Sequence, residues 1–199
     1  MAHLTFWFEF ASAYSYLSAM RIEEMARKAD VGLIWKPFLL GPIFKAQNWD
    51  TSPFNIYPAK GRYVARDIER IAQERGLIFR LPAPFPQNGL LAARLTLAGL
   101  EAGWGPAFIR SVFKLEFAEQ RNIAEQSTLA TALAAAGAPE IEAFERARSP
   151  EIKNQLRTNT EEAQARGIFG APSFTTESGE LFWGDDRLEH ALLWSTRIN

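Results

Sequence analysis

The chain has 199 residues, of which 22 are basic and 23 acidic, and its formal net charge at pH 7 is −1. This balance argues against nucleic acid or an anionic membrane surface as a partner. The sequence contains no cysteine and only two histidines, which excludes disulfide exchange, zinc–thiolate binding and a cysteine nucleophile, and we expect no metal site. We expect a soluble, cytoplasmic protein, because neither a signal peptide nor a membrane-spanning apolar run is recognisable.

The first forty residues predict a strand, a helix and a second strand. Residues 4–10 alternate between two faces and are rich in phenylalanine, which is typical of a strand. Apolar side chains then recur at helical spacing over residues 14–29, and residues 33–40 predict a second strand. Pro37 favours an edge or a bulge for this strand, and the helical crossover predicts that the two strands are parallel.

Residues 41–58 predict an irregular loop that contains several prolines and asparagines. Its aromatic residues argue against disorder. They either form a wall for a flat substrate or pack in the core, and the sequence favours neither reading. The four residues are Phe44, Trp49, Phe54 and Tyr57.

The rest of the chain predicts a block of helices, a hairpin and a last helix. Glycines end several of these helices, as Gly103 does. The hairpin joins strands over residues 172–176 and 180–183. Either Asp185 or Asp186 begins the last helix as its N-cap.

The order of these elements predicts an α/β fold class. Neither the first nor the last segment could bury its strands alone, so we expect both to contribute to one sheet. Residues 1–40 and 150–199 then form one α/β domain, and residues 41–149 form an all-helical insertion domain. We expect a ligand cleft between the two.

The segment Gly170-Ala171-Pro172 resembles the Gly–Val–Pro step of the thioredoxin superfamily, in which the proline follows a cis peptide bond. Such a bond is uncommon and needs local context to hold it. In the superfamily, the residue before the proline offers its backbone to an extended thiol peptide as an added strand. The resemblance implies that Ala171 and Pro172 bind the cysteinyl part of a thiol ligand.

Residues 10–17, Phe-Ala-Ser-Ala-Tyr-Ser-Tyr-Leu, resemble the opening of 2-hydroxychromene-2-carboxylate isomerases and of kappa-class glutathione transferases. Further pieces agree in order, so the resemblance covers essentially the whole chain. Two positions depart from the pattern, since Glu9 replaces an aspartate and Ala13 replaces the usual proline. The further pieces include Lys36-Pro-Phe, Lys60-Gly-Arg-Tyr63 and Trp183-Gly-Asp-Asp-Arg187.

The resemblance implies a thioredoxin-like fold, glutathione as cofactor and a homodimer. The implied reaction is the glutathione-dependent isomerisation of 2-hydroxychromene-2-carboxylate to trans-o-hydroxybenzylidenepyruvate, as in naphthalene breakdown. A glutathione thiolate held by Ser12 would add to the conjugated carbon, the bond would rotate as a single bond, and glutathione would leave. Two alternatives stay open: kappa-like glutathione transfer to another electrophile, and a non-catalytic thioredoxin-like binding module.

Ser12 stands where redox relatives carry a reactive cysteine, at the predicted N-terminus of the first helix. Backbone N–H groups and the helix dipole favour an anion there, and the hydroxyl can donate to a ligand thiolate. Lowering a thiol pKa by one unit requires about 1.4 kcal/mol, which a charge-assisted hydrogen bond of about 1.5–3 kcal/mol can supply. The plainer alternative is that Ser12 only caps the helix, and the two roles are compatible.

The resemblance implies further binding residues in three other segments. The turn Asp185, Asp186 and Arg187 would bind the γ-glutamyl end of glutathione, although aspartate is also a common helix cap and arginine a common surface residue. Asn55 in the loop would also contact glutathione. Lys36 lies in an apolar strand, where a lysine is rarely buried without a partner, and would meet a substrate carboxylate.

Overall fold

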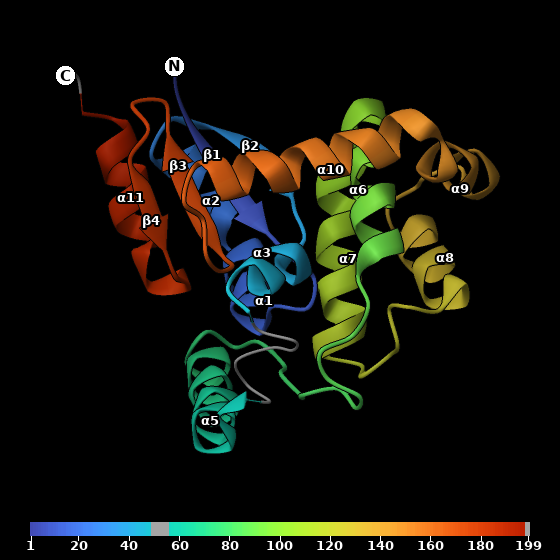
Figure 1. Cartoon of the computed structure of the whole chain (residues 1–199), viewed down its shortest axis with the longest axis horizontal. Helices are drawn as coiled ribbons and strands as arrows, with labels where there is room; N and C mark the ends of the chain where they lie inside the picture. The colour runs from blue at the N-terminus through green and yellow to red at the C-terminus, as the bar shows by residue number, and fades with distance from the viewer. Residues whose placement is uncertain (49–55, 198–199) are drawn as a thin grey trace.

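The computed structural model describes residues 1–48 and 56–197 of the chain (Figure 1). Within them, four strands form one sheet in the order β2-β1-β3-β4. The first two pair in parallel, and β3 and β4 add antiparallel strands from the other end of the chain. The expected parallel pair and the expected sharing of one sheet are therefore confirmed. The strands are β1 (Ala2–Phe8), β2 (Val31–Pro37), β3 (Ser173–Thr176) and β4 (Leu181–Trp183).

Helices cover both faces of this sheet. One face carries buried phenylalanines such as Phe6 and Phe8, and the other carries Trp7. Trp7 packs in a second apolar cluster with residues of α3 and α10, so these helices cover its face. The helices of this layer are α1 (Ala13–Ala19), α2 (Ile22–Lys28), α3 (Leu40–Ala46), α10 (Pro150–Ala165) and α11 (Leu188–Ser195), the last preceded by the 3₁₀ turn η1 (Asp185–Arg187).

The helix predicted over residues 14–29 is two helices, which corrects the sequence-based expectation. Arg21 leaves helical geometry with φ −129°, and α2 begins after it. Its guanidinium group donates to the Asp185 backbone and side chain, 164 positions further along the chain. We infer that this long-range pairing overrides the helical periodicity, which continues across the break.

The loop predicted over residues 41–58 is partly helical, because α3 occupies its first residues. The helix begins at Leu40, whose N–H donates to the Glu9 carboxylate at 2.9 Å. This cap comes from the end of β1, so local sequence could not indicate it. Trp49 and Phe54, two of the aromatic residues of this loop, lie outside the described residues.

In the described residues, the insertion contains α5 to α9, with α6–α9 grouped beside the sheet layer and α5 lying apart from them (Figure 1). Phe10, just after β1, packs against Phe113 with ring centroids 4.9 Å apart. One apolar core thus runs through both parts, and the division into two domains stays a prediction. These helices are α5 (Pro58–Glu74), α6 (Leu90–Ala102), α7 (Gly105–Phe117), α8 (Gln126–Ala135) and α9 (Glu140–Arg148). No helix in the described chain has the length and apolar character needed to cross a bilayer.

Two carboxyl groups lie close to the end of β1, with Glu116 buried and Glu9 half-buried. Glu116 of α7 is fully buried, and neither of its carboxyl oxygens has a hydrogen-bond partner among the described residues. Burial, and then the charge of Glu9, raise the pKa of Glu116 well above its ordinary value. Burial also raises the pKa of Glu9 to about 7, although the Leu40 N–H opposes this. Burial therefore favours the neutral, protonated form of Glu116 more strongly than for an exposed glutamate.

The raised pKa values of Glu9 and Glu116 predict that their contribution to stability falls as pH rises. Their pKa values are higher in the folded chain than the ordinary value of 4.5, so the folded chain holds protons that the unfolded chain releases. The stabilisation that these two groups contribute is fully present below about pH 4.5 and is lost as pH rises through their folded-state pKa values. We expect Glu116→Gln to lessen this fall and to raise the melting temperature at pH 8 by about 3 °C or more.

Thermal melts at pH 5 and pH 8 test this expectation. Glu119→Gln, at an exposed position just after the same helix, is the matched control and should follow the wild type at both values. An identical pH dependence in Glu116→Gln and wild type would contradict the assignment of buried titration to Glu116.

Candidate functional site

Ser12 is the N-cap of α1, as the sequence predicts. Its backbone is extended, with φ −105° and ψ 109°, and its hydroxyl oxygen accepts from the Ser15 N–H at 3.2 Å. The same hydroxyl donates to the carbonyl oxygen of Ala171 at 2.8 Å. The structure therefore brings together two predicted site residues that lie 159 positions apart.

The Ala171–Pro172 peptide bond is cis, as expected. Pro172 accepts a hydrogen bond from the Gly184 N–H at 3.0 Å, which joins this bend to the turn after β4. The Ala171 carbonyl is occupied by Ser12, and its N–H has no hydrogen-bond partner in the described part of the chain. A backbone donor is thus available beside the Ser12 hydroxyl.

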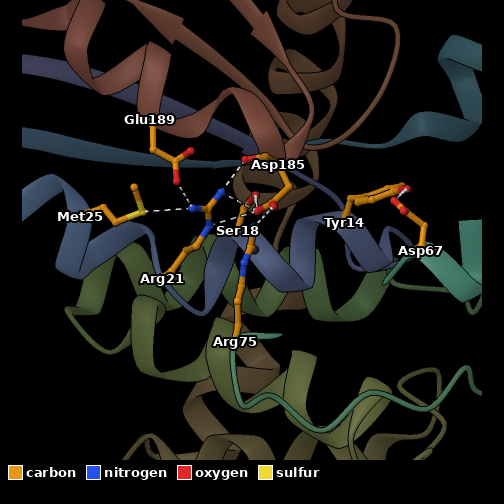
Figure 2. A network of polar contacts seen from close by, with 8 residues as sticks. All are labelled: Tyr14, Ser18, Arg21, Met25, Asp67, Arg75, Asp185 and Glu189. Atoms are coloured by element: carbon orange, nitrogen blue, oxygen red, sulfur yellow. Dashed lines mark hydrogen bonds and ion pairs between the residues drawn. The ribbon is translucent and has the colours of Figure 1, made fainter. Parts of the chain in front are cut away.

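Asp185 is the centre of a buried polar network (Figure 2). Its carboxylate accepts from the Ser18 hydroxyl at 2.9 Å, from Arg21 at 3.3 Å and from Arg75 at 2.7 Å. Glu189 pairs with the other side of the Arg21 guanidinium group. Since the Asp185 side chain is only 3% exposed, its charge is committed to holding α1, α5 and the η1 turn together.

The other two residues of this turn face solvent. Asp186 and Arg187 form an ion pair at 3.1 Å, with side chains 71% and 50% exposed. Of the three residues predicted to bind a γ-glutamyl group, these two are accessible and Asp185 is not. The binding role of the turn stays a prediction, with Asp186 as its accessible carboxylate.

Lys36 is paired within the protein. Its ammonium group forms an ion pair with Glu162 of α10 and lies 4.8 Å from the centroid of the Trp7 ring. Arg166 also donates to Glu162 at 2.9 Å. A substrate carboxylate would have to compete with Glu162 for Lys36. Asn55, the remaining predicted binding residue, lies outside the described residues.

A cavity of ≈ 300 Å³ opens beside the start of α1. Ala13, the neighbour of Ser12, forms part of its wall, and α5 forms most of the rest. Arg62 is the charged residue of the wall. The sequence did not indicate it as a binding residue, and its only signal was its place in the segment Lys60-Gly-Arg-Tyr63, which resembles the family. The lining residues are Ala13, Pro58, Gly61, Arg62, Val64, Ala65, Ile68, Leu81 and Phe85.

The predicted aromatic wall is only partly visible. Phe44 packs against the apolar cluster around Trp7, which favours the core-packing alternative for this residue. Tyr57 is exposed. Neither lines the cavity, whose aromatic wall comes from Phe85 in the connector before α6.

Tyr14 fixes α5 against α1. Its hydroxyl donates to Asp67 of α5 at 2.9 Å, a contact visible at the right of Figure 2. Burial, and then the Asp67 carboxylate, raise the pKa of Tyr14 above its ordinary value, so it remains a protonated donor. Arg75, at the C-terminal end of α5, pairs with Asp185. This ion pair and the Tyr14–Asp67 hydrogen bond hold α5 beside the cavity.

The chain is similar to a thioredoxin-domain family model, to an isomerase and to a glutathione transferase. A family model described as a DSBA-like thioredoxin domain matches residues 3–192. A 2-hydroxychromene-2-carboxylate isomerase of Sphingobium xenophagum is 26% identical over 187 residues, covering 94% of each chain. Glutathione s-transferase kappa 2 of Caenorhabditis elegans is 28% identical over 200 residues, covering 92% of this chain and 87% of the relative.

A solved structure of 2-hydroxychromene-2-carboxylate isomerase shares the fold. It superimposes with a TM-score of 0.82 at 24% identity and covers 94% of this chain and 90% of its own. The thioredoxin-like α/β fold with a helical insertion, expected from the sequence, is therefore confirmed.

Proposed function

The chain belongs to the family of DSBA-like thioredoxin domains, and from that premise we propose that it is a glutathione-dependent isomerase of 2-hydroxychromene-2-carboxylate. The observation that carries the proposal is the Ser12 hydroxyl, held 2.8 Å from the backbone of the cis-proline bend in a chain without cysteine. Two relatives bear the names of such an isomerase and of a glutathione transferase. By resemblance, the proposal extends to aromatic breakdown, a cytoplasmic location and a homodimer.

The residues of the site fit glutathione. Ala171 offers a free N–H to an extended peptide, as β-strand addition requires. Asp186 and Arg187 lie exposed on the turn that is hydrogen-bonded to Pro172, and they carry the charges that complement an ammonium and a carboxylate group. Asn55 remains a proposed contact. Bound glutathione supplies a nucleophilic sulfur that adds reversibly to a conjugated carbon.

Ser12 acts in this proposal as a hydrogen-bond donor to that sulfur. The Ser12 hydroxyl now donates its hydrogen bond to the Ala171 carbonyl and would have to rotate to donate to the ligand sulfur, while its oxygen keeps accepting from the Ser15 N–H. Donation to an anion is about twice as strong as donation to a neutral carbonyl, so the exchange favours the thiolate. Ser12 needs no neighbouring base, because it is not the nucleophile.

The second candidate is glutathione transfer, which the kappa-class relative favours. Both reactions use the same thiolate, and they differ in whether glutathione is consumed. The test mixes protein, glutathione and 2-hydroxychromene-2-carboxylate and follows free thiol together with substrate. Constant thiol during conversion supports the isomerase, whereas an equal loss of thiol supports transfer.

A third outcome would overturn both enzymatic proposals. If glutathione neither stabilises the protein in a thermal melt nor accelerates conversion, the chain is a thioredoxin-like binding module. Thermal melts with and without glutathione therefore accompany the thiol assay.

A further inference from the structure

We propose that the cavity between α1 and α5 binds a planar aromatic monocarboxylate and that Arg62 binds its carboxylate group. The inference rests on the proposed function, because it places the second substrate beside the thiolate held by Ser12. The cation that binds the substrate carboxylate is then Arg62, whereas the sequence resemblance implies Lys36.

The cavity wall favours an apolar ligand. Most of its side chains are hydrocarbon, including Val64, Ile68, Leu81 and Phe85. Such walls bind by burial of apolar surface and leave orientation to a few polar groups. A volume of ≈ 300 Å³ lies at the lower end of small-molecule sites and is large enough for one or two fused rings.

Arg62 is the cation available to such a ligand. It lines the cavity, and no ion pair or hydrogen bond of its side chain occurs among residues 1–48 and 56–197. The next arginines along α5 are committed, Arg66 to Glu69 at 2.8 Å and Arg70 to Asp67 at 3.6 Å. A guanidinium group matches the two oxygens of a carboxylate, so Arg62 favours a carboxylate over a neutral group.

Lys36 is the competing cation, and its surroundings disfavour it. Glu162 already neutralises its charge, and the Trp7 ring lies against the ammonium group. The residue is not part of the cavity wall. A second carboxylate at Lys36 would have to displace Glu162 from the ammonium group.

The attachment of α5 places this site next to Ser12. Ala13 forms the cavity wall one residue after Ser12, so a ring in the cavity lies beside the start of α1. The Tyr14–Asp67 hydrogen bond and the Arg75–Asp185 ion pair fix α5, and with it Arg62, relative to α1 (Figure 2). The cavity is thus built to hold an electrophile near a bound thiolate.

Calorimetric titration without glutathione tests the inference. The probes are 2-naphthoate and 2-naphthamide, which share a ring system and differ in charge. We expect wild type to bind the carboxylate more tightly. Because Arg62 is exposed, we expect Arg62→Met to weaken the binding of 2-naphthoate by about two- to fivefold and to leave the binding of 2-naphthamide unchanged. Arg66→Met, one turn away and outside the cavity, is the matched control and should bind both probes like wild type.

Three results would overturn the inference. In the first, wild type binds neither probe. In the second, Arg62→Met lowers the affinity for both probes equally. In the third, Lys36→Met lowers the affinity for 2-naphthoate selectively and Arg62→Met does not. Thermal melts show whether each variant is folded. No glutathione is present in this titration, so its result does not depend on whether Ser12 holds a thiolate. If the thiolate proposal were wrong, the affinities for these two probes would be unchanged.

Discussion

We expect Ser12→Ala to lower glutathione-dependent turnover by at least about tenfold while the protein stays folded. The hydroxyl is the only group of Ser12 that the substitution removes, and a charge-assisted hydrogen bond contributes about 1.5–3 kcal/mol. Because about 1.4 kcal/mol corresponds to a factor of ten, this loss predicts a reduction of at least that size. Turnover is measured with saturating glutathione, so that weaker binding does not obscure the result.

Two further variants separate the thiolate role from the capping role. Glycine is nearly as good an N-cap as serine, so Ser12→Gly should keep the stability of α1 and still lose turnover. Ser15→Ala removes a buried hydroxyl that has no partner in the described structure and should retain turnover. If Ser12→Gly retains the turnover of the wild type, Ser12 acts through the helix cap alone.

The second large effect concerns Asp185. Asp185→Asn keeps the shape of the side chain and removes the charge that Arg21 and Arg75 share. Removing one partner of a buried ion pair costs about 3–5 kcal/mol, and since these arginines are partly exposed we expect a loss of about 2–4 kcal/mol. Urea unfolding followed by far-ultraviolet circular dichroism measures the change in the free energy of unfolding.

The neighbouring carboxylate is the matched control. Asp186 is exposed, so Asp186→Asn should change stability by less than about 0.5 kcal/mol. An exposed ion pair contributes about 0.2–1 kcal/mol, so the same variant should weaken glutathione binding by about two- to fivefold. The reverse pattern, with stability lost at Asp186 and retained at Asp185, would contradict the roles that their surroundings indicate.

The sequence predicts well those features that depend on local chemistry. Ser12 as a helix cap and the cis bond before Pro172 depend on a few neighbouring residues and a recognisable pattern. The strand alternation around Phe6 and the end of α6 at Gly103, with φ +88°, are likewise local. The resemblance of these segments also predicts the fold, because it extends over essentially the whole chain.

Features that depend on distant partners could not be predicted in this way. The break at Arg21 follows from an ion pair with Asp185, and α3 begins where Glu9 caps it. The partner of Lys36 is Glu162, 126 positions away, so the strand alone could not indicate that its charge is already neutralised. Arg62 becomes a candidate binding residue only when the cavity wall is assembled.

The central claim is that Ser12 holds glutathione as a thiolate, and titration of glutathione followed by thiolate absorbance tests it most directly. Wild type and Ser12→Ala are titrated across pH with the same ligand. The account predicts that the pKa of the bound thiol is at least about one unit lower in wild type than in Ser12→Ala, corresponding to about 1.4 kcal/mol. An equal thiol pKa in two proteins that both bind glutathione would contradict it.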